Sequence, residues 1–304
     1  MIYSHDAKLG VHAASSEALE FDGHLDFLKA FIKRLVGPDR GCLVVTQSDI
    51  PERTGLGGSG AMGVAMVGAI TRALGATMSK DDIALLADEI ERKDLGNRGG
   101  NQDSFGSAIG GVKLITYHKG GGCSCDRLKI PDDTLAQLER DSLMIYTGQP
   151  HLSGTIHDDI KNWYHQENSP TIKAMDGLKA AAQRMAAALP SGDLRVYVAC
   201  LNASRGLHYA LHPSCDNDRL RQFFDALAPH IHGGKTCGAG GGGFILVHMK
   251  SNRRKECVET AQAIGGRVWN LSFDHQGLIT WEEPPSSEGE IASLSQMVTG
   301  RGVK

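Results

Sequence analysis

The apolar positions of this chain alternate between short runs typical of strands and longer stretches with helical spacing. Between Asp26 and Val36, large apolar residues recur at the helical interval, and Gly37 with Pro38 ends the pattern. Similar patterns predict helices at 61–74, 79–95, 194–211, 218–231 and 254–264. Helical segments are also predicted after the strand that ends at residue 146, up to about residue 189. Short apolar runs predict strands at 42–46, 112–117, 127–130, 143–146 and 244–248, with more strand within 267–281. Residues 1–24 show neither pattern, so an irregular, polar beginning is expected.

The order of these elements indicates an α+β fold. Helices and strands alternate without the regular βαβ period of a parallel sheet, so we expect two α+β halves. A boundary between Pro131 and Arg140 would give an N-terminal domain over 1–135 and a C-terminal domain over 136–283. Residues 284–304 are polar with few large apolar side chains, and a disordered tail is expected there.

Composition and charge narrow the class of function. With 41% hydrophobic residues, 22% charged residues and a formal net charge of −3, nothing favours a nucleic-acid partner. The longest strongly apolar stretch, 61–70, is too short to span a bilayer, and no basic-then-apolar leader opens the sequence. The seven cysteines are scattered, and Cys123 and Cys125 lack a second pair that would complete a zinc site. We therefore expect a cytoplasmic protein without a membrane or nucleic-acid partner.

The most informative stretch is 51–60, Pro-Glu-Arg-Thr-Gly-Leu-Gly-Gly-Ser-Gly, which follows a strand and leads into a helix of small residues. Glycines let successive backbone N–H groups converge on an anion, and a helix start adds partial positive charge. The stretch therefore predicts a phosphate-binding loop. A tight turn with close helix packing would use the same residues.

Gly55–Gly60 also satisfies the dinucleotide-binding pattern G-x-G-x-x-G. In that fold the glycine turn follows its strand at once, whereas here about eight residues separate them. The acidic residue sought ~20 positions later should end a second strand, yet Asp81 and Asp82 follow Ser79 at a predicted helix start. A dinucleotide-dependent oxidoreductase is therefore a distant alternative.

Two further motifs follow in order. Residues 89–103 carry Glu-Ile-Glu-Arg, then Leu-Gly, then Gly-Gly-Asn-Gln-Asp, and residues 238–243 are Gly-Ala-Gly-Gly-Gly-Gly. With the loop 51–60, they resemble the motifs of the galactokinase, homoserine kinase, mevalonate kinase and phosphomevalonate kinase (GHMP) family, whose phosphate loop is P-x3-G-L-G-S-S-A. Tyr-Thr-Gly at 146–148 and its spacing to Lys235 most resemble the D-glycero-D-manno-heptose 7-phosphate kinases. The likeness covers roughly residues 20–283.

The resemblance implies a fold and an activity. The fold is a two-domain GHMP-kinase-like one, with an N-terminal mixed sheet with helices and a ferredoxin-like α+β C-terminal half. The activity is ATP- and Mg²⁺-dependent phosphoryl transfer to a hydroxyl of a sugar or sugar phosphate, with the anomeric hydroxyl of a heptose 7-phosphate as one acceptor. A catalytically weak or inactive nucleotide- or metabolite-binding descendant is the alternative. The acceptor and the oligomeric state, including a homodimer, stay open.

The resemblance also assigns roles to residues. Ser59 and Glu91 match the metal-binding residues of the family, and Asp103 matches its base. The residues that hold the ATP phosphates are Gly55, Leu56, Gly57, Gly58, Ser59 and Gly60. The residues that support this loop near the acceptor are Gly238, Ala239, Gly240, Gly241 and Gly242. One hydroxyl and one carboxylate suit Mg²⁺, and phosphoryl transfer needs a group that orients or deprotonates the acceptor hydroxyl.

Each assigned residue has a structural alternative. Ser59 would serve as a helix cap, Glu91 as a surface acid paired with Arg92 or Lys93, and Asp103 as a turn residue. His208 and His212 lie four positions apart on a predicted helix and could share a metal, but a half-exposed helix face explains them better.

The chain departs from the family pattern at two places. Nothing before Cys42 resembles the basic, Gly-rich first motif of the family, and Gly58 and Gly60 stand where the family has Ser and Ala. The first strands of the N-terminal sheet are therefore expected to be missing, which leaves strand 42–46 with an unpaired apolar edge that favours association. The expected result is a poorly soluble protein or a weak kinase.

Overall fold

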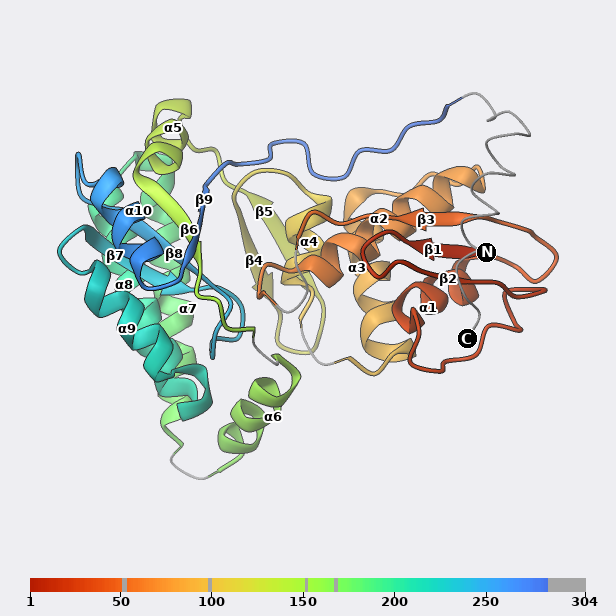
Figure 1. Ribbon diagram of the computed structural model, residues 1–304, viewed down its shortest axis with the longest axis horizontal. Helices are drawn as coiled ribbons and strands as arrows, with labels where there is room; N and C mark the ends of the chain where they lie inside the picture. The colour runs from red at the N-terminus through yellow and green to blue at the C-terminus, as the bar shows by residue number, and fades with distance from the viewer. Residues whose placement is uncertain (51–53, 98–99, 151–152, 167–168, 284–304) are drawn as a thin grey trace. The chain divides into compact units, whose positions relative to one another are not determined.

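The computed structural model describes residues 1–50, 54–97, 100–150, 153–166 and 169–283 (Figure 1). Contacts divide the chain into two compact units. Unit 1 comprises Met1–Pro51, Gly58–Ile109 and Gln276–Lys304, and unit 2 comprises Glu52–Gly57 and Gly110–His275. The chain therefore passes from unit 2 to unit 1 between Gly57 and Gly58, within the predicted phosphate-binding loop. Separate domains over 1–135 and 136–283 stay a prediction, and the expected tail 284–304 lies outside the described residues.

Unit 1 contains a small mixed sheet with strand order β2-β1-β3. β1 (Ile2–Ser4) pairs antiparallel with β2 (Leu9–Val11) and parallel with β3 (Val44–Thr46). The expectation of an irregular beginning over 1–24 is therefore wrong for β1 and β2, whereas residues 12–24 have no helix or strand. β1 and β2 have three residues each, too few to give the alternating pattern that predicts a strand. These two strands are recognised by their pairing with neighbouring strands, which the periodicity of the sequence cannot predict.

The helices of unit 1 are α1 (Asp26–Leu35), α2 (Gly58–Ala73), α3 (Lys80–Glu89) and α4 (Gln102–Ala108). Phe31 of α1 is fully buried, and a Cβ on Gly63 of α2 would lie 2.9 Å from its ring. Gly63 therefore lets the two helices approach closely. The predicted start of α3 is confirmed, because the Ser79 hydroxyl accepts a hydrogen bond from the backbone N–H of Asp82 at 3.1 Å.

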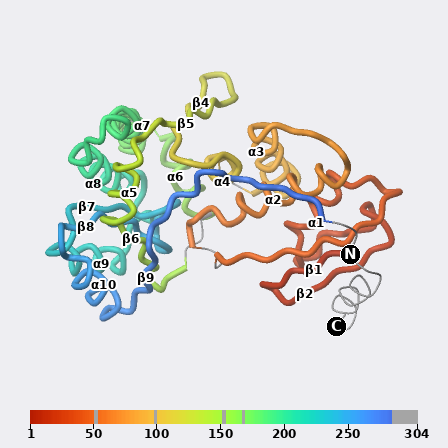
Figure 2. Tube along the Cα trace, turned by 90° about the horizontal axis from the view of Figure 1, so that it is seen from above, coloured from red at the N-terminus to blue at the C-terminus, as the bar shows by residue number. Residues whose placement is uncertain are grey.

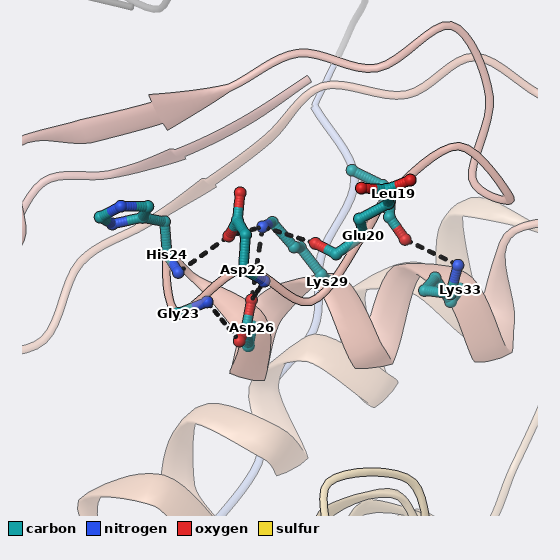
Figure 3. A network of polar contacts seen from close by, with 8 residues as sticks. All are labelled: Leu19, Glu20, Asp22, Gly23, His24, Asp26, Lys29 and Lys33. Carbon is teal, nitrogen blue, oxygen red and sulfur yellow. Dashed lines mark hydrogen bonds and ion pairs between the residues drawn. The ribbon is translucent and has the colours of Figure 1, made fainter. Parts of the chain in front are cut away.

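Two lysines of α1 hold the segment that precedes this helix (Figure 3). Lys29 is 1% exposed, donates to the carbonyl of Glu20 at 2.8 Å and pairs with the carboxylates of Asp22 and Asp26. Lys33, one turn further along, donates to two more carbonyls of the segment. These partners compensate the burial of the Lys29 charge, and the network fixes how the chain enters α1.

The last described segment of the chain belongs to unit 1 and runs beside α2 (Figure 2). A Cβ on Gly68 would lie 2.7 Å from the Leu278 side chain, so this glycine makes room for the segment. Arg72 of α2 pairs with Glu282 at 3.2 Å.

β3 is shorter than the strand expected at 42–46, and it pairs with β1, so the expectation that the first strands of this sheet are missing is wrong for β1 and β2. The other side of β3 is an edge of the sheet. β3 borders a largely apolar hollow of about 640 Å³ between the strand and one face of α2. The lining includes Val36, Leu43, Val45, Met62, Met66 and Ile70.

Unit 2 contains an antiparallel sheet with strand order β7-β8-β6-β9. Its strands are β6 (Ser142–Tyr146), β7 (Ile231–Thr236), β8 (Phe244–Met249) and β9 (Arg267–Asn270). The helices of unit 2 are α5 (Asp132–Asp141), α6 (Ser153–Tyr164), α7 (Pro170–Ala188), α8 (Leu194–Leu211), α9 (Asp218–Leu227) and α10 (Arg254–Ala263). The strand order and connections give the ferredoxin-like arrangement expected for the C-terminal half.

Helices cover both faces of this sheet. Ile245 and Val247 of β8 pack with α9 and α10, whereas Leu246 between them packs with α5 and α8. This alternation follows from the two-residue period of a strand. Within the described ranges, no helix combines the length and the apolar character needed to cross a membrane.

A hairpin, β4 (Lys113–Tyr117) and β5 (Cys123–Arg127), completes the described strands of unit 2. The expected return strand at 127–130 is displaced toward the turn, because Tyr117 already pairs with Cys123. Residues 120–122, three glycines with positive φ, form the tight connection. The polar residues of β5 concealed this strand in the sequence.

Candidate active site

The predicted phosphate-binding loop turns at two glycines and leads into helix α2. Gly55 and Gly57 have φ of 77° and 70°, a region that glycine adopts without the strain that other residues suffer. The helix begins at Gly58, earlier than the predicted residue 61. The first N–H groups of a helix have no partner within it, and the first turn of α2 carries no acidic residue. The positive end of α2 is therefore suited to an anion.

Gly60 allows α2 to lie directly against the start of α4. A Cβ at Gly60 would come within 2.7 Å of the Asp103 Cβ, 2.9 Å of the Asp103 carbonyl carbon and 3.0 Å of the Ser104 nitrogen. Real Cβ atoms essentially never approach so closely. The absence of a side chain at Gly60 therefore determines how near the predicted base lies to the predicted phosphate-binding loop.

Ser59, Glu91 and Asp103 come together in unit 1. The Glu91 carboxylate is hydrogen-bonded to the Ser59 side chain and to the Asn97 amide, the latter at 3.5 Å. Burial raises the pKa of Glu91, and the negative charges of Asp103 and Asp88 raise it further. A cation placed among these carboxylates would relieve this repulsion.

Glu91 lies in a π-helical turn, Ile90–Asp94, which continues α3. The backbone N–H of Leu95 bonds to the carbonyl of Ile90 at 3.3 Å, five residues back instead of the four of an α-helix. Such turns are frequent at functional sites because they change the direction in which the following side chains point. Nothing in the apolar spacing of the sequence predicts this turn.

The basic residues next to Glu91 form ion pairs with other acids. Arg92 pairs with Asp88 at 2.5 Å, and Lys93 pairs with Glu89 at 3.3 Å, each four residues back along the chain. The Glu91 side chain is instead hydrogen-bonded to Ser59 and Asn97. The arrangement favours a functional position for Glu91 over a simple surface ion pair.

The oxygen donors of this cluster fit Mg²⁺. Magnesium is held by one or two carboxylates, with waters and substrate phosphates completing its shell. Among the described residues, no group of three or more His, Cys, Asp and Glu side chains is arranged to hold a metal. One hydroxyl and one or two carboxylates therefore fit an ion shared with a phosphate substrate better than one enclosed by protein.

The second glycine loop, 238–243, lies in unit 2 and is fixed by backbone contacts on several sides. Gly241 N–H donates to the carbonyl of Cys215 at 2.9 Å, and Gly243 N–H donates to that of Gln149 at 2.7 Å. The Asn217 amide donates to the carbonyl of Gly241 at 2.8 Å. A Cβ at position 240, 241 or 242 would lie less than 3.0 Å from neighbouring atoms. The glycines are therefore required by close packing as well as by their positive φ.

The second glycine loop contacts the first part of the phosphate-binding loop within unit 2. A Cβ at Gly238 would lie 3.0 Å from the Cα of Gly55, and the Phe244 N–H donates to the carbonyl of Thr54 at 3.1 Å. These contacts fit the supporting role that the family resemblance implies for residues 238–242, which stays a prediction.

The expectation for the two histidines is wrong in two respects. His208 is 8% exposed inside α8, and its Nδ1 lies 3.3 Å from the Thr236 hydroxyl. His212 lies beyond the end of the helix with extended backbone, and its Nδ1 lies 2.8 Å from the Ser214 hydroxyl. The sequence interval placed both on one helical face, but α8 ends at Leu211.

Sequence reasoning also missed Asn97 and Asn217. The contacts of single amide side chains leave no periodic signal in the sequence.

The comparison with known families agrees with this geometry. Residues 24–111 match the model of the GHMP kinases N terminal domain, and this range contains Ser59, Glu91 and Asp103. The match identifies a GHMP kinase N-terminal domain in this part of the chain. Its named relatives are kinases, so the chain is a phosphotransferase of the sugar-kinase type, and these relatives do not support a dinucleotide-dependent oxidoreductase.

Its relatives include a named heptose kinase. The chain is 28% identical over 272 residues to the D-glycero-alpha-D-manno-heptose 7-phosphate kinase of Campylobacter jejuni, across 88% of this chain and 80% of that protein. A D-glycero-D-manno-heptose 1-phosphate kinase from Bacteroides thetaiotaomicron has the same fold, with a TM-score of 0.72, 23% identity and coverage of 93% and 83%. Galactokinase from Lactococcus lactis also shares the fold, with a TM-score of 0.66, 14% identity and coverage of 91% and 82%.

Proposed function

We propose that this protein transfers the γ-phosphate of ATP to a hydroxyl of a sugar or sugar phosphate, and that a heptose 7-phosphate with a free anomeric hydroxyl is the first acceptor to test. The observation that carries the proposal is the convergence of Ser59, Glu91 and Asp103 close to the N-terminus of α2. The similarity to the Campylobacter kinase supports the choice of acceptor.

In this proposal Asp103 acts on the acceptor hydroxyl. Its carboxylate orients the hydroxyl and takes its proton as the acceptor oxygen bonds to the γ-phosphorus. The bond between the γ-phosphorus and the bridging oxygen breaks on the opposite side, and ADP leaves with the electron pair. Asp103 is exposed at the start of α4, so an acceptor can reach it.

The other residues hold the donor. The backbone N–H groups of 55–60 bind the phosphates, and Gly238, where a Cβ would lie 3.0 Å from the Gly55 Cα, supports the loop at Gly55. Ser59 and Glu91 would hold Mg²⁺, which would supply positive charge to neutralise the charge of the ATP phosphates. The hydrogen bond between these two side chains places both donors at one point.

We further propose that the enzyme works in a reducing cytoplasm on small molecules alone. All seven cysteines are free thiols, and the net charge of −3 provides no basic surface excess for nucleic acid.

The test is ATP consumption against a panel of sugars and sugar phosphates, with heptose 7-phosphates included. The proposal expects Mg²⁺-dependent release of ADP with at least one member, and formation of the matching phosphorylated sugar. Binding of ATP and Mg²⁺ without turnover on any acceptor would instead support the inactive binding protein.

A further inference from the structure

The second glycine loop contains one residue, Ala239, whose position the contacts of the glycines do not explain. Positions 238 and 240–243 are glycines, whereas Ala239 carries a side chain, is 6% exposed and packs in a cluster with Ile156 and Cys215. The backbone of Gly241 and Gly243 is held by carbonyls of neighbouring segments. The part of the loop around Ala239 must be fixed by something else.

That contact comes from His208 of α8. The His208 ring hydrogen-bonds to the backbone of Ala239, and its Nδ1 lies 3.3 Å from the hydroxyl of Thr236, which is fully buried. The two partners flank Cys237 and Gly238. The ring therefore spans the turn at which Gly238 packs on Gly55 of the phosphate-binding loop.

The surroundings of His208 keep the ring neutral. Burial lowers the pKa of His208 to about 4, and positive charge from Lys235 of β7 and from His157 of α6 acts in the same direction, while the Ala239 hydrogen bond opposes it. A neutral imidazole has one donor and one acceptor nitrogen, which matches a turn with one backbone partner and one hydroxyl partner. At neutral pH the ring can make both contacts without a charge.

We propose that His208 is a positioning residue for the phosphate-binding loop: by holding Ala239 and Thr236 it fixes Gly238 against Gly55. The inference rests on the proposed function for its effect on nucleotide binding, but its effect on the loop itself does not. Helix α8 thereby acts, within unit 2, on the part of the predicted phosphate-binding loop that contains Gly55. The sequence singled out His208 only for its four-residue interval to His212.

The test compares two buried histidines of unit 2. His208→Phe fills the site without hydrogen bonds, and His208→Gln keeps a donor and an acceptor. His248→Phe is the control, because His248 is 5% exposed and its Nδ1 lies 3.2 Å from the buried Ser142 hydroxyl, in the sheet and away from the glycine loop. Backbone hydrogen exchange of residues 237–244, the Kd for ATP with Mg²⁺ and the thermal unfolding midpoint are measured for all four proteins.

Loss of the His208 contacts should speed exchange in 237–244 and raise the Kd for ATP, each roughly 2- to 12-fold, which is the range for a lost hydrogen bond. His248→Phe should lower the unfolding midpoint comparably and leave both readouts near wild type, and His208→Gln should restore them to within about twofold. Unchanged exchange of 237–244 in His208→Phe overturns the inference. A wild-type protein that does not bind ATP refutes the proposed function instead, and the exchange comparison still decides the role of His208.

Discussion

Replacement of Gly60 by Ala tests whether its contact with Asp103 sets the active-site geometry. The new Cβ would lie 2.7 Å from the Asp103 Cβ, whereas ordinary contacts begin at 3.4 Å. The start of α4 must therefore retreat by about 0.7 Å, a change typical of overpacked sites, which cost roughly 1–3 kcal/mol of stability. The atoms that resist include the backbone of Asp103 and Ser104, which cannot rotate away as a flexible side chain would.

The effect on rate should exceed the effect on stability. Misplacement of a catalytic group by about 1 Å can reduce a rate ~100-fold, so we expect kcat of Gly60→Ala to fall roughly 10- to 100-fold. Gly106→Ala is the matched control, since it adds the same methyl group within a helix of unit 1, α4, at a position where the new Cβ would have no neighbouring atom within 4 Å. It should leave kcat nearly unchanged. The kcat and the thermal unfolding midpoint are measured for both variants. Equal kcat values in the two variants would show that the contact between Gly60 and Asp103 does not set the active-site geometry.

Three further predictions concern the metal residues, acid stability and the sheet edge. Ser59→Ala and Glu91→Gln should each raise the Mg²⁺ concentration that gives half the maximal rate. Their combined effect should be less than additive because both side chains act on one ion. If neither variant changes the Mg²⁺ dependence of the rate, these residues do not bind the metal. His208 has a folded-state pKa of about 4 against 6.5 in the unfolded chain, so its stabilising contribution is present above pH 6.5 and is lost as the pH falls toward 4. Wild type should lose about 2 kcal/mol more than His208→Gln between pH 7 and pH 5, and parallel denaturation curves would contradict this. β3 is an edge strand that carries the exposed Val45, so the protein should associate through this edge. Val45→Lys should reduce association in light scattering, and a monodisperse wild type would count against this prediction.

The sequence predicted those parts of the fold that local chemistry decides. The Ser79 cap, the amphipathic α1 and the small-residue helix after the phosphate loop all follow from contacts between residues near in the chain. By contrast, β1 and β2 depend on partners for their definition, and the return of 276–283 to α2 depends on contacts distant in sequence. Three-residue strands and extended segments are too short or too irregular for the sequence pattern to predict them.

The candidate site shows the same limit. Its residues were assigned through the resemblance to the family motifs, and their roles stay a prediction. Neither the resemblance nor the apolar pattern indicated the π-helical turn at Ile90–Asp94 or the near-contact of Gly60 with Asp103. Both depend on how one helix meets another. His208 was placed on a half-exposed face because its neighbours in sequence gave no sign that β7 and the glycine loop would cover it.

The most direct test of the central claim follows the γ-phosphate itself. ATP labelled at the γ-position is mixed with Mg²⁺, a heptose 7-phosphate or the best acceptor of the panel, and either wild type or Asp103→Asn. The account predicts label on the acceptor with wild type, and a rate lower by roughly 10²–10⁴ with Asp103→Asn, while the Kd for ATP stays nearly unchanged. An Asn variant that transfers label at half the wild-type rate would contradict it.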